Sequence, residues 1–390
     1  MLEKVRGAVT ERHEEADARA NYSIEALEPA LRNVQAYVQL PLLYEHWYVA
    51  GTSDEFSRKL VAKTLLNRSI VFYRKESGEL VALQNRCAHR SYPLSESFLE
   101  GDTIRCGYHG IRYNPDGSIL KVPCQDRVPT LGVRSYAIHE MGPLVWIWMG
   151  DGPADESKMP DMTPYTSSDW TFCVGTLPMP GNYLLMQENL ADLSHLPYLH
   201  ATTFGVPESW GSKTTEMTID EERLTVDFYR ESTEWEQAKT FFPPYFNYEG
   251  RNLLDRAGGR YETPAFFRGW DLLKIKDSAP GERDEFRVYF DHFLTPETGS
   301  STHYYYGVAR DHALEDSALT EGVRQIMARA FAQDSEAVGH MQKLLDTDRH
   351  DFKELIIAGD RTAVASRRMI LRLVEREYGP QSKNRHSQHR

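Results

Sequence analysis

The chain has 390 residues, of which 41% are hydrophobic and 26% charged, and its formal net charge is −12. This length suffices for two domains with separate cores. The absence of a basic stripe argues against nucleic acid as the main partner. No segment approaches the ~20 apolar residues of a membrane span. The charged N-terminus also lacks a signal-peptide core, so a cytoplasmic protein is expected.

The N-terminal part of the chain is predicted to form a charged helical arm over residues 1–40, followed by short strands. The runs 46–52 and 142–150 are rich in β-forming residues, and 69–85 has the pattern of a hairpin around a Ser-Gly turn. A Pro- and Asp-rich stretch, 151–164, has the composition of a linker. We therefore place the two domains at 41–155 and 156–380, and expect the first to be all-β.

The second domain is predicted to have an α+β fold with an antiparallel sheet flanked by helices. Alternating apolar and polar residues predict strands at 223–230, 286–296 and 302–311. From about Asp316 to Tyr378 the pattern is helical, and the polar tail 381–390 is expected to be flexible.

Two Cys-His pairs form the first candidate site. Cys87-x-His89 is followed after sixteen residues by Cys106-x2-His109, and Gly, Pro or Ser flank each pair, which predicts two opposed loops. Two thiolates and two imidazoles suit zinc or an iron–sulfur cluster. Structural zinc usually draws on Cys-Cys and His-His pairs, so the mixed pairs favour a [2Fe–2S] cluster with Cys87 and Cys106 on one iron and both His on the other.

The remaining cysteines, Cys124 and Cys173, lie outside this motif. Structural disulfides are disfavoured in a cytoplasmic chain, and free cysteine commonly behaves as a small buried hydrophobe. We expect core packing for both residues.

The stretch "NLADLSHLPYLH" (189–200) forms the second candidate site. On an ideal helix Asp192 and His195 are neighbours, whereas His195 and His200 point about 140° apart. A break or kink at Pro197 would let the two imidazoles converge. Two His and a carboxylate make the facial triad of non-haem iron(II) oxygenases, and Asp192 is one candidate for the carboxylate.

Asp334 is a second candidate carboxylate, in the helical stretch 320–345. It interrupts an apolar stripe that runs from Val323 to Met341 and Leu344. A carboxylate facing a core needs a cation, several donors or a metal, and a buried salt bridge is the alternative explanation. Weaker rivals for the same role are Glu188, Glu336 and Asp346.

Together the two motifs resemble those of the Rieske non-haem iron oxygenases, over roughly residues 45–345. The resemblance implies an N-terminal all-β Rieske domain and an α+β catalytic domain, with Cys87, His89, Cys106 and His109 on a [2Fe–2S] cluster. It implies that His195, His200 and Asp334 bind a mononuclear Fe(II). Asp192 would then accept a hydrogen bond from the active-site His and bridge to the neighbouring subunit's His109, and Asn189 would lie beside the iron.

The same resemblance implies a terminal oxygenase of a multicomponent system that acts with O₂ on a small aromatic substrate. It implies a separate reductase or ferredoxin and a homotrimer with electron transfer between subunits. The single chain resembles the O-demethylating and monooxygenating branch more than the two-subunit dioxygenases. The alternatives are a ring cis-dihydroxylating or angular dioxygenase, and an electron-transfer or sensing protein with no oxygenase activity.

Substrate recognition is the least defined part of the prediction. Aromatic runs at 241–248, 265–270, 288–293 and 303–307 suit either an aromatic pocket or a sheet core. Four arginines could receive a substrate carboxylate, although surface positions are more common for this residue: Arg251, Arg256, Arg260 and Arg268.

Overall fold

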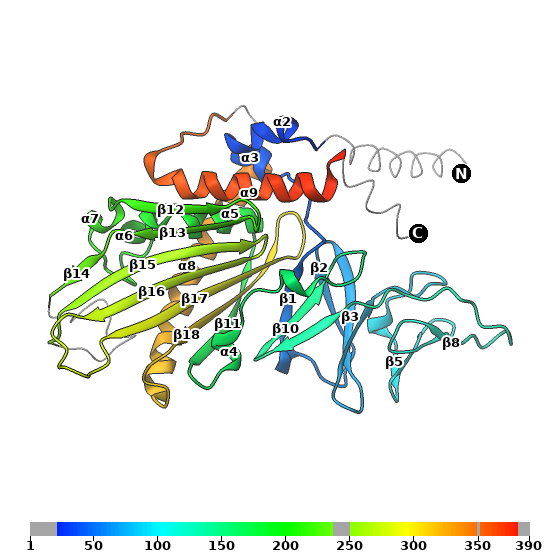
Figure 1. The fold of residues 1–390 in the computed structure, drawn as a ribbon. Coiled ribbons are helices and arrows are strands. Elements are labelled where there is room, and N and C mark those ends of the chain that lie inside the picture. Colours follow the sequence, from blue (N-terminus) through cyan, green and yellow to red (C-terminus); the bar gives the residue numbers. More distant parts are fainter. Residues whose placement is uncertain (1–21, 237–249, 349–351, 381–390) are drawn as a thin grey trace.

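The computed structural model describes residues 22–236, 250–348 and 352–380 (Figure 1). Most of the predicted arm, the aromatic run 241–248 and the predicted tail 381–390 lie outside these residues. The described part of the arm forms three short helical segments: α2 (Ile24–Leu27), η1 (Glu28–Leu31) and α3 (Val34–Tyr37).

The N-terminal domain is built from three small antiparallel sheets. One sheet has the order β1-β10-β9, one β2-β3-β4 and one β5-β6-β7-β8. The predicted strands 46–52 and 142–150 and the hairpin are confirmed. The strands are β1 (Trp47–Thr52), β2 (Val61–Leu65), β3 (Arg68–Arg74), β4 (Leu80–Gln84), β5 (Phe98–Glu100), β6 (Thr103–Arg105), β7 (Arg112–Tyr113), β8 (Ile119–Lys121), β9 (Ile138–Met141) and β10 (Leu144–Trp148).

Within the described residues, the second half of the chain forms one eight-stranded antiparallel sheet in the order β11-β18-β17-β16-β15-β13-β12, with β14 paired to β15. The three predicted strands are confirmed as β13, β17 and β18. The strands are β11 (Thr171–Met179), β12 (Thr215–Asp220), β13 (Thr225–Arg230), β14 (Thr233–Trp235), β15 (Leu253–Thr263), β16 (Phe266–Ile275), β17 (Glu285–Pro296) and β18 (Thr302–Arg310).

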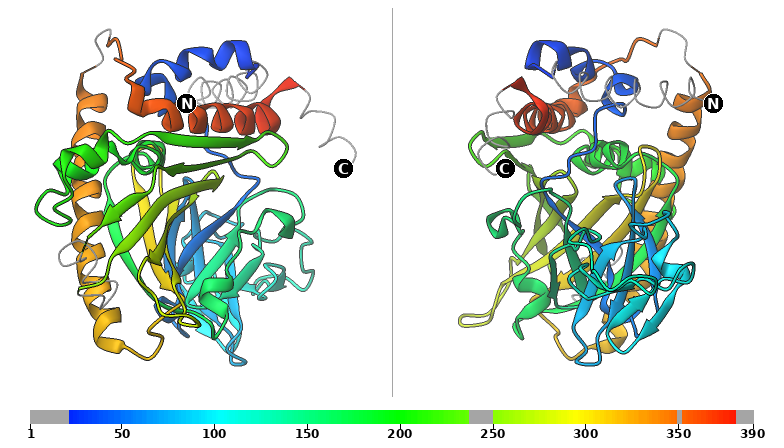
Figure 2. Two further views of the ribbon diagram at one scale, coloured as in Figure 1. Left: turned by 60° about the vertical axis from the view of Figure 1, so that its left-hand side comes forward. Right: turned by 90° about the vertical axis from the view of Figure 1, so that its right-hand side faces the viewer.

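Two long helices flank this sheet, as Figures 1 and 2 show. Helix α8 (Ser317–Thr347) runs behind the sheet and packs on β11, and α9 (Arg361–Tyr378) lies across the β13 side and against α5 (Tyr183–Ala191). The prediction of continuous helix to Tyr378 is wrong, because residues 352–357 are not helical. The short segments that complete the fold are η2 (Ser53–Glu55), η3 (Leu94–Glu96), η4 (Glu156–Lys158), α4 (Thr163–Thr166), η5 (Leu193–His195), α6 (Leu196–Leu199), α7 (Glu208–Gly211) and η6 (Ala358–Asp360).

The buried face of α8 also differs from the predicted stripe near its C-terminal end. Met341 and Leu344 are 42% and 63% exposed, whereas Val338 and Gln342 are buried. The buried face thus advances in steps of four from Asp334 onward. The buried amide of Gln342 is satisfied, because its oxygen accepts from a backbone N–H at 2.9 Å and its nitrogen donates to an Asp346 oxygen at 2.9 Å.

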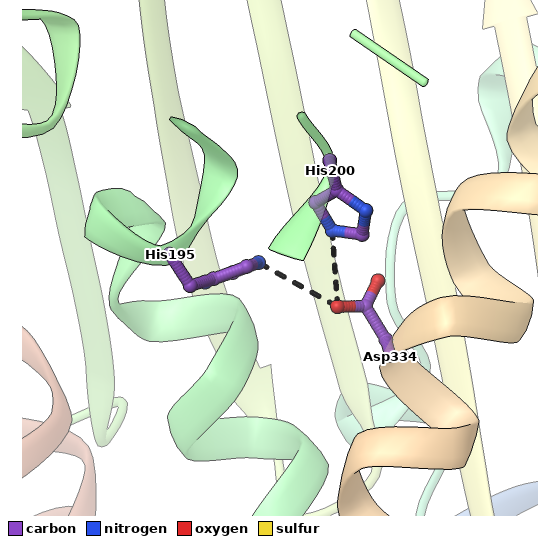
Figure 3. Close-up of side chains that lie close together, drawn as sticks. All are labelled: His195, His200 and Asp334. Carbon is purple, nitrogen blue, oxygen red and sulfur yellow. Dashed lines mark hydrogen bonds and ion pairs between the residues drawn. The ribbon is translucent and has the colours of Figure 1, made fainter. Parts of the chain in front are cut away.

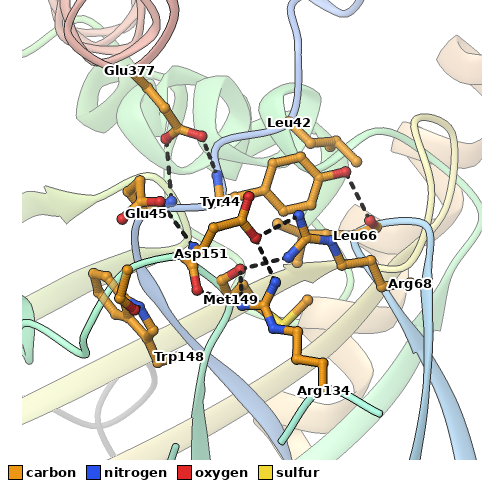
Figure 4. Close-up of polar contacts among 12 residues, drawn as sticks. Leu42, Tyr44, Glu45, Leu66, Arg68, Arg134, Trp148, Met149, Asp151 and Glu377 are labelled. Atoms are coloured by element: carbon orange, nitrogen blue, oxygen red, sulfur yellow. Dashed lines mark hydrogen bonds and ion pairs between the residues drawn. The ribbon is translucent and has the colours of Figure 1, made fainter. Parts of the chain in front are cut away.

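A polar network joins α9 to the segment that leads into β1 (Figure 4). The Glu377 carboxylate accepts hydrogen bonds from the backbone N–H groups of Tyr44 at 2.7 Å and Glu45 at 3.2 Å. Burial raises the pKa of Glu377 to about 7, against these hydrogen bonds, which favour the charged form. Asp151, in the predicted linker, accepts a 2.5 Å hydrogen bond from Arg134. These contacts connect α9 to the segment before β1 and hold the start of the predicted linker against the N-terminal domain.

No helix in the described ranges has both the length and the apolar character to cross a membrane.

Candidate metal centre and cluster site

The stretch 189–200 folds as three short helical pieces. Helix α5 ends before Asp192, whose backbone is extended (φ −116°, ψ 100°) and whose side chain caps η5. The Asp192 carboxylate accepts from the Ser194 N–H at 2.9 Å and from the Ser194 hydroxyl at 2.8 Å. The predicted break at Pro197 is therefore misplaced. Pro197 lies in the first turn of α6, where its missing N–H has no helical partner to lose.

This break lets His195 and His200 converge on Asp334, which lies 134 residues after His200 in the sequence (Figure 3). Asp334 Oδ1 lies 3.1 Å from His200 Nε2 and 3.5 Å from His195 Nε2. Each of the three residues offers one ligand atom, and these three atoms all lie within 4.8 Å of one another. Asp334 is 3% exposed and His200 2%, so the group lies inside the protein.

The other ring nitrogen of each imidazole is held by an acceptor. His195 Nδ1 lies 2.7 Å from the backbone carbonyl of Asp192, and His200 Nδ1 lies 2.9 Å from Oε1 of Gln333. Each Nδ1 therefore carries a proton and donates it, which leaves both Nε2 lone pairs directed at the Asp334 carboxylate. These groups repel one another unless a metal ion lies among them or His200 Nε2 takes up a proton and donates it to Asp334. The donor set fits a divalent metal held by two imidazoles and one carboxylate.

Burial is the largest influence on the pKa of both imidazoles. It lowers the pKa of His195 below its ordinary value, although the nearby Asp334 charge acts in the opposite direction. For His200 the burial effect is outweighed by the hydrogen bond and charge of Asp334, and the pKa is raised.

The two polar neighbours predicted for this site have different positions. Asn189 Nδ2 donates to Asp334 Oδ1 at 3.1 Å, so it lies beside the three converging side chains. The hydrogen bond expected between the Asp192 side chain and the active-site His is instead made by the Asp192 backbone carbonyl. The reason is local, since Ser194 occupies the Asp192 carboxylate. Sequence reasoning also missed Gln333, which accepts from His200 and, at 2.8 Å, from Thr203.

The three rival carboxylates lie outside this group. Glu188 forms a buried ion pair with Arg367. Glu336 is exposed on α8, and Asp346 accepts from the Gln342 side chain.

A largely apolar cavity of about 120 Å³ opens on the three side chains. This is the size scale of a cavity that holds one benzene-sized ring. Its walls come from α5, α6, α8 and strands β15 to β17, and its aromatic lining is Phe204, Trp210, Phe267, Trp270, Phe290 and Phe331. Part of the predicted aromatic runs thus forms the pocket. Tyr304, Tyr305 and Tyr306 are instead buried in the core.

The four candidate arginines do not line this cavity. Arg251 pairs with Asp277 at 3.1 Å, and Arg260 pairs with Asp227 at 2.6 Å. Arg268 is buried against Asp291 at 2.7 Å, and Arg256 lies over the Tyr229 ring. A role for these residues in holding a substrate carboxylate at the cavity is therefore not supported.

The Cys-His motif lies on two loops of the N-terminal domain, each tightly turned. The Cys87 N–H donates to a backbone oxygen at 2.9 Å, and the Cys106 N–H does so at 2.8 Å. The Tyr113 hydroxyl lies 3.1 Å from the Cys87 sulfur. Both cysteines are buried, whereas His89 and His109 are exposed with ring centroids 4.7 Å apart. Burial, above all, raises the pKa of Cys106, and the neighbouring Cys87 thiol adds to this effect.

This arrangement fits a two-iron cluster, because the thiols form an inner pair and the imidazoles an outer pair. Of the other cysteines, Cys173 is buried as predicted. Cys124 is exposed, so the core position predicted for it is wrong. It lies in the loop between β8 and β9, outside the described helices and strands.

Both halves of the chain match families of known proteins. Residues 46–136 match the Rieske [2Fe–2S] domain, and residues 179–376 match the vanillate O-demethylase oxygenase C-terminal domain. The chain is 33% identical over 354 residues to the iron–sulfur subunit of a toluene-4-sulfonate monooxygenase system from Comamonas testosteroni, an alignment that covers 85% of this chain and 97% of that relative. It belongs to the Rieske oxygenase family.

A second relative of this Rieske oxygenase is a vanillate O-demethylase oxygenase subunit from a Pseudomonas strain, 30% identical over 348 residues, with 85% of this chain and 94% of the relative covered. The crystal structure of dicamba monooxygenase bound to 3,6-dichlorosalicylic acid has the same fold, with a TM-score of 0.78 at 23% identity, covering 86% of this chain and 99% of that one.

The predicted fold class and cofactors of this Rieske oxygenase are thereby confirmed. An all-β Rieske domain precedes an α+β domain with an antiparallel sheet. The enzyme is an oxidoreductase, the oxygenase component of a multicomponent monooxygenase system, and its cofactors are a Rieske [2Fe–2S] cluster and a mononuclear iron.

Proposed function

We propose that this oxygenase monooxygenates a single-ring aromatic compound, by O-demethylation or by hydroxylation. The observation that carries the proposal is the aromatic-lined cavity, which opens directly on His195, His200 and Asp334. The relatives named for vanillate O-demethylation and toluene-4-sulfonate monooxygenation support the same reaction class.

In this proposal His195, His200 and Asp334 hold the mononuclear iron. When bound, the iron supplies the site for O₂ activation beside the substrate. Gln333 and the Asp192 carbonyl keep both imidazoles in the tautomer that offers Nε2, and Asn189 orients the carboxylate. The apolar walls exclude water from the substrate.

Cys87 and Cys106 are proposed to hold one iron of the cluster, and His89 and His109 the other. The exposed imidazoles lie at the surface, where a separate reductase or ferredoxin can approach. Neutral imidazoles in place of two thiolates reduce the negative charge around the cluster and raise its potential.

We further propose a homotrimer in which Asp192 connects the iron site of one protomer to His109 of the partner subunit. Asp192 lies beside Gly359, where a Cβ atom would come within 3.4 Å of the carboxylate. The adjoining non-helical segment 352–357 exposes apolar side chains, with Leu355 80% exposed. Exposed apolar clusters of this kind commonly mark protein–protein contacts.

The test combines metal analysis with turnover of the purified oxygenase. We expect NADH-dependent O₂ uptake and a product heavier by one oxygen, or lighter by one methylene, only when a reductase is added. The His195→Ala variant should lose this activity and one iron per chain, while the exposed His340→Ala variant keeps both. The proposed function would be contradicted if aromatic acids, ethers and amines all failed to give an oxidised product.

A further inference from the structure

The cavity carries two acidic side chains on its sheet wall. Asp255 on β15 and Asp271 on β16 both line it. Asp255 pairs in register with Leu273, and Ala257 pairs with Asp271. The two aspartates therefore lie diagonally across neighbouring strands on the same face, within reach of one another.

One of these carboxyls has an unused acceptor. Asp255 is 2% exposed, and among the residues that the structure describes its Oδ1 has no hydrogen-bond partner. Such an atom is costly to bury unless a donor reaches it. The indole of Trp235 interacts with the Asp255 carboxyl, but it leaves Oδ1 unsatisfied.

Among the described residues that line the cavity, none is a lysine or an arginine. The charge of Lys213 acts on Asp255, but the Lys213 ammonium donates to the backbone oxygen of Ser232 at 2.9 Å. The cavity thus presents acceptors and acids to a ligand and offers no cation from this wall.

Burial raises the pKa of Asp255 to about 7, against a smaller opposing effect of Trp235 and Lys213. Burial also raises the pKa of Asp271, and the charge of Asp255 adds to that shift. Near neutral pH the pair therefore retains protons, and a second negative charge there is strongly disfavoured.

The acidic pair lies away from the candidate iron ligands. Phe267 on β16 pairs with His292 on β17, and His292 contacts Phe331, which is one turn from Asp334 on α8. Asp271 is four residues further along β16, a distance of about 13 Å at the rise of a strand. A ligand therefore meets the acidic pair with a different end from the one that faces the candidate iron site.

We propose that the substrate of this oxygenase carries a nitrogen-borne hydrogen-bond donor, an amine or anilide N–H, at the end that faces Asp255 and Asp271. An anionic group at that end is disfavoured, since it would add a buried negative charge beside an ionisable pair with no lysine or arginine in the described lining to balance it. This inference rests on the proposed function and narrows its substrate class. Toluene-4-sulfonate and vanillate, after which two relatives are named, are both anions, so the substrate proposed for this chain differs from them in charge.

The test is calorimetric binding of three probes of one shape to the metal-loaded protein without reductase: 4-methoxybenzylamine, 4-methoxybenzamide and 4-methoxybenzoate. We expect the amine and the amide to bind at least about tenfold more tightly than the benzoate. The Asp255→Asn and Asp271→Asn variants should each reduce the preference for the amine. Asp169→Asn, the same change at an exposed position outside the cavity, should leave it unchanged.

Two results overturn the inference: benzoate binding as tightly as the amine, or no binding of either nitrogen-bearing probe. If Asp255→Asn does not fold, Asp271→Asn carries the comparison. Turnover with reductase separates this inference from the proposed function. Preferred oxidation of the benzoate keeps the proposed function and overturns the inference, whereas tight binding of the amine without oxidation of any probe contradicts the proposed function alone.

Discussion

Replacing Asp255 by Asn is expected to change how the stability of the protein depends on pH. Burial raises the pKa of Asp255 to about 7, against an ordinary value of 3.8. The folded state therefore binds more protons than the unfolded state between these values, and the free energy of unfolding falls as pH rises through this window. Three pKa units correspond to about 4 kcal/mol, of which about 3 kcal/mol falls between pH 5 and pH 8. An amide does not ionise, so the variant avoids this loss.

Urea unfolding followed by tryptophan fluorescence at pH 5 and pH 8 measures the difference. The free energy of unfolding of Asp255→Asn, measured relative to the wild type, should rise by about 3 kcal/mol between pH 5 and pH 8. Asp169→Asn, at an exposed position, should follow the wild type at both pH values. Identical pH dependence in Asp255→Asn and the wild type would refute the reasoning, because the carboxyl would then ionise as easily in the folded protein as in the unfolded chain.

Three further changes test the site and its support. Gln333→Leu leaves His200 Nδ1 without its acceptor and should weaken iron binding by about 10- to 100-fold in a chelator competition. Gln333→Glu should restore the binding. Iron retention in the Leu variant equal to that of the wild type would argue against this role. Asp192→Ala should keep both metal centres in an iron count yet lose O₂ uptake, and loss of the mononuclear iron would instead identify Asp192 as a ligand. Arg367→Met leaves the Glu188 carboxylate buried without its partner and should cost about 3–5 kcal/mol in urea unfolding, so a cost below about 1 kcal/mol contradicts this estimate.

The candidate metal ligands could be predicted because each leaves a local signal. The mixed Cys-His pairs have a spacing that few other sites share. Asp334 is a carboxylate at a position where the helical period requires a hydrophobe, and it is indeed buried. The route by which the site forms was not predictable in the same way. The helix ends at Asp192 because Ser194 supplies an N–H and a hydroxyl to its side chain, a local competition that periodicity does not reveal.

The substrate wall had no readable pattern for a different reason. Strands β15 and β16 contain Gly258, Gly259 and Gly269, which weaken the alternation that identifies a strand. Gly258 lies opposite Trp270 in the sheet, and a Cβ atom there would come within 2.3 Å of the indole. The acidic pair depends on strand register across the sheet. Its members appear in the sequence as ordinary polar residues, sixteen positions apart.

The helical prediction for residues 352–357 is wrong because hydrophobic content alone does not distinguish a buried helix turn from an exposed segment. Phe352, Leu355 and Ile357 are each more than half exposed. Whether these side chains are covered depends on contacts with other chains, which the local sequence pattern does not specify.

The central claim is that His195, His200 and Asp334 hold an iron separate from the cluster, and the ratio of iron to acid-labile sulfide tests it most directly. The wild type should contain about three irons and about two sulfides per chain. Asp334→Asn should fall to about two irons with its sulfide and its visible cluster absorption unchanged, while Glu336→Gln, an exposed neighbour on the same helix, keeps all three. Full iron content in Asp334→Asn, or a wild type with only two irons, would contradict the account.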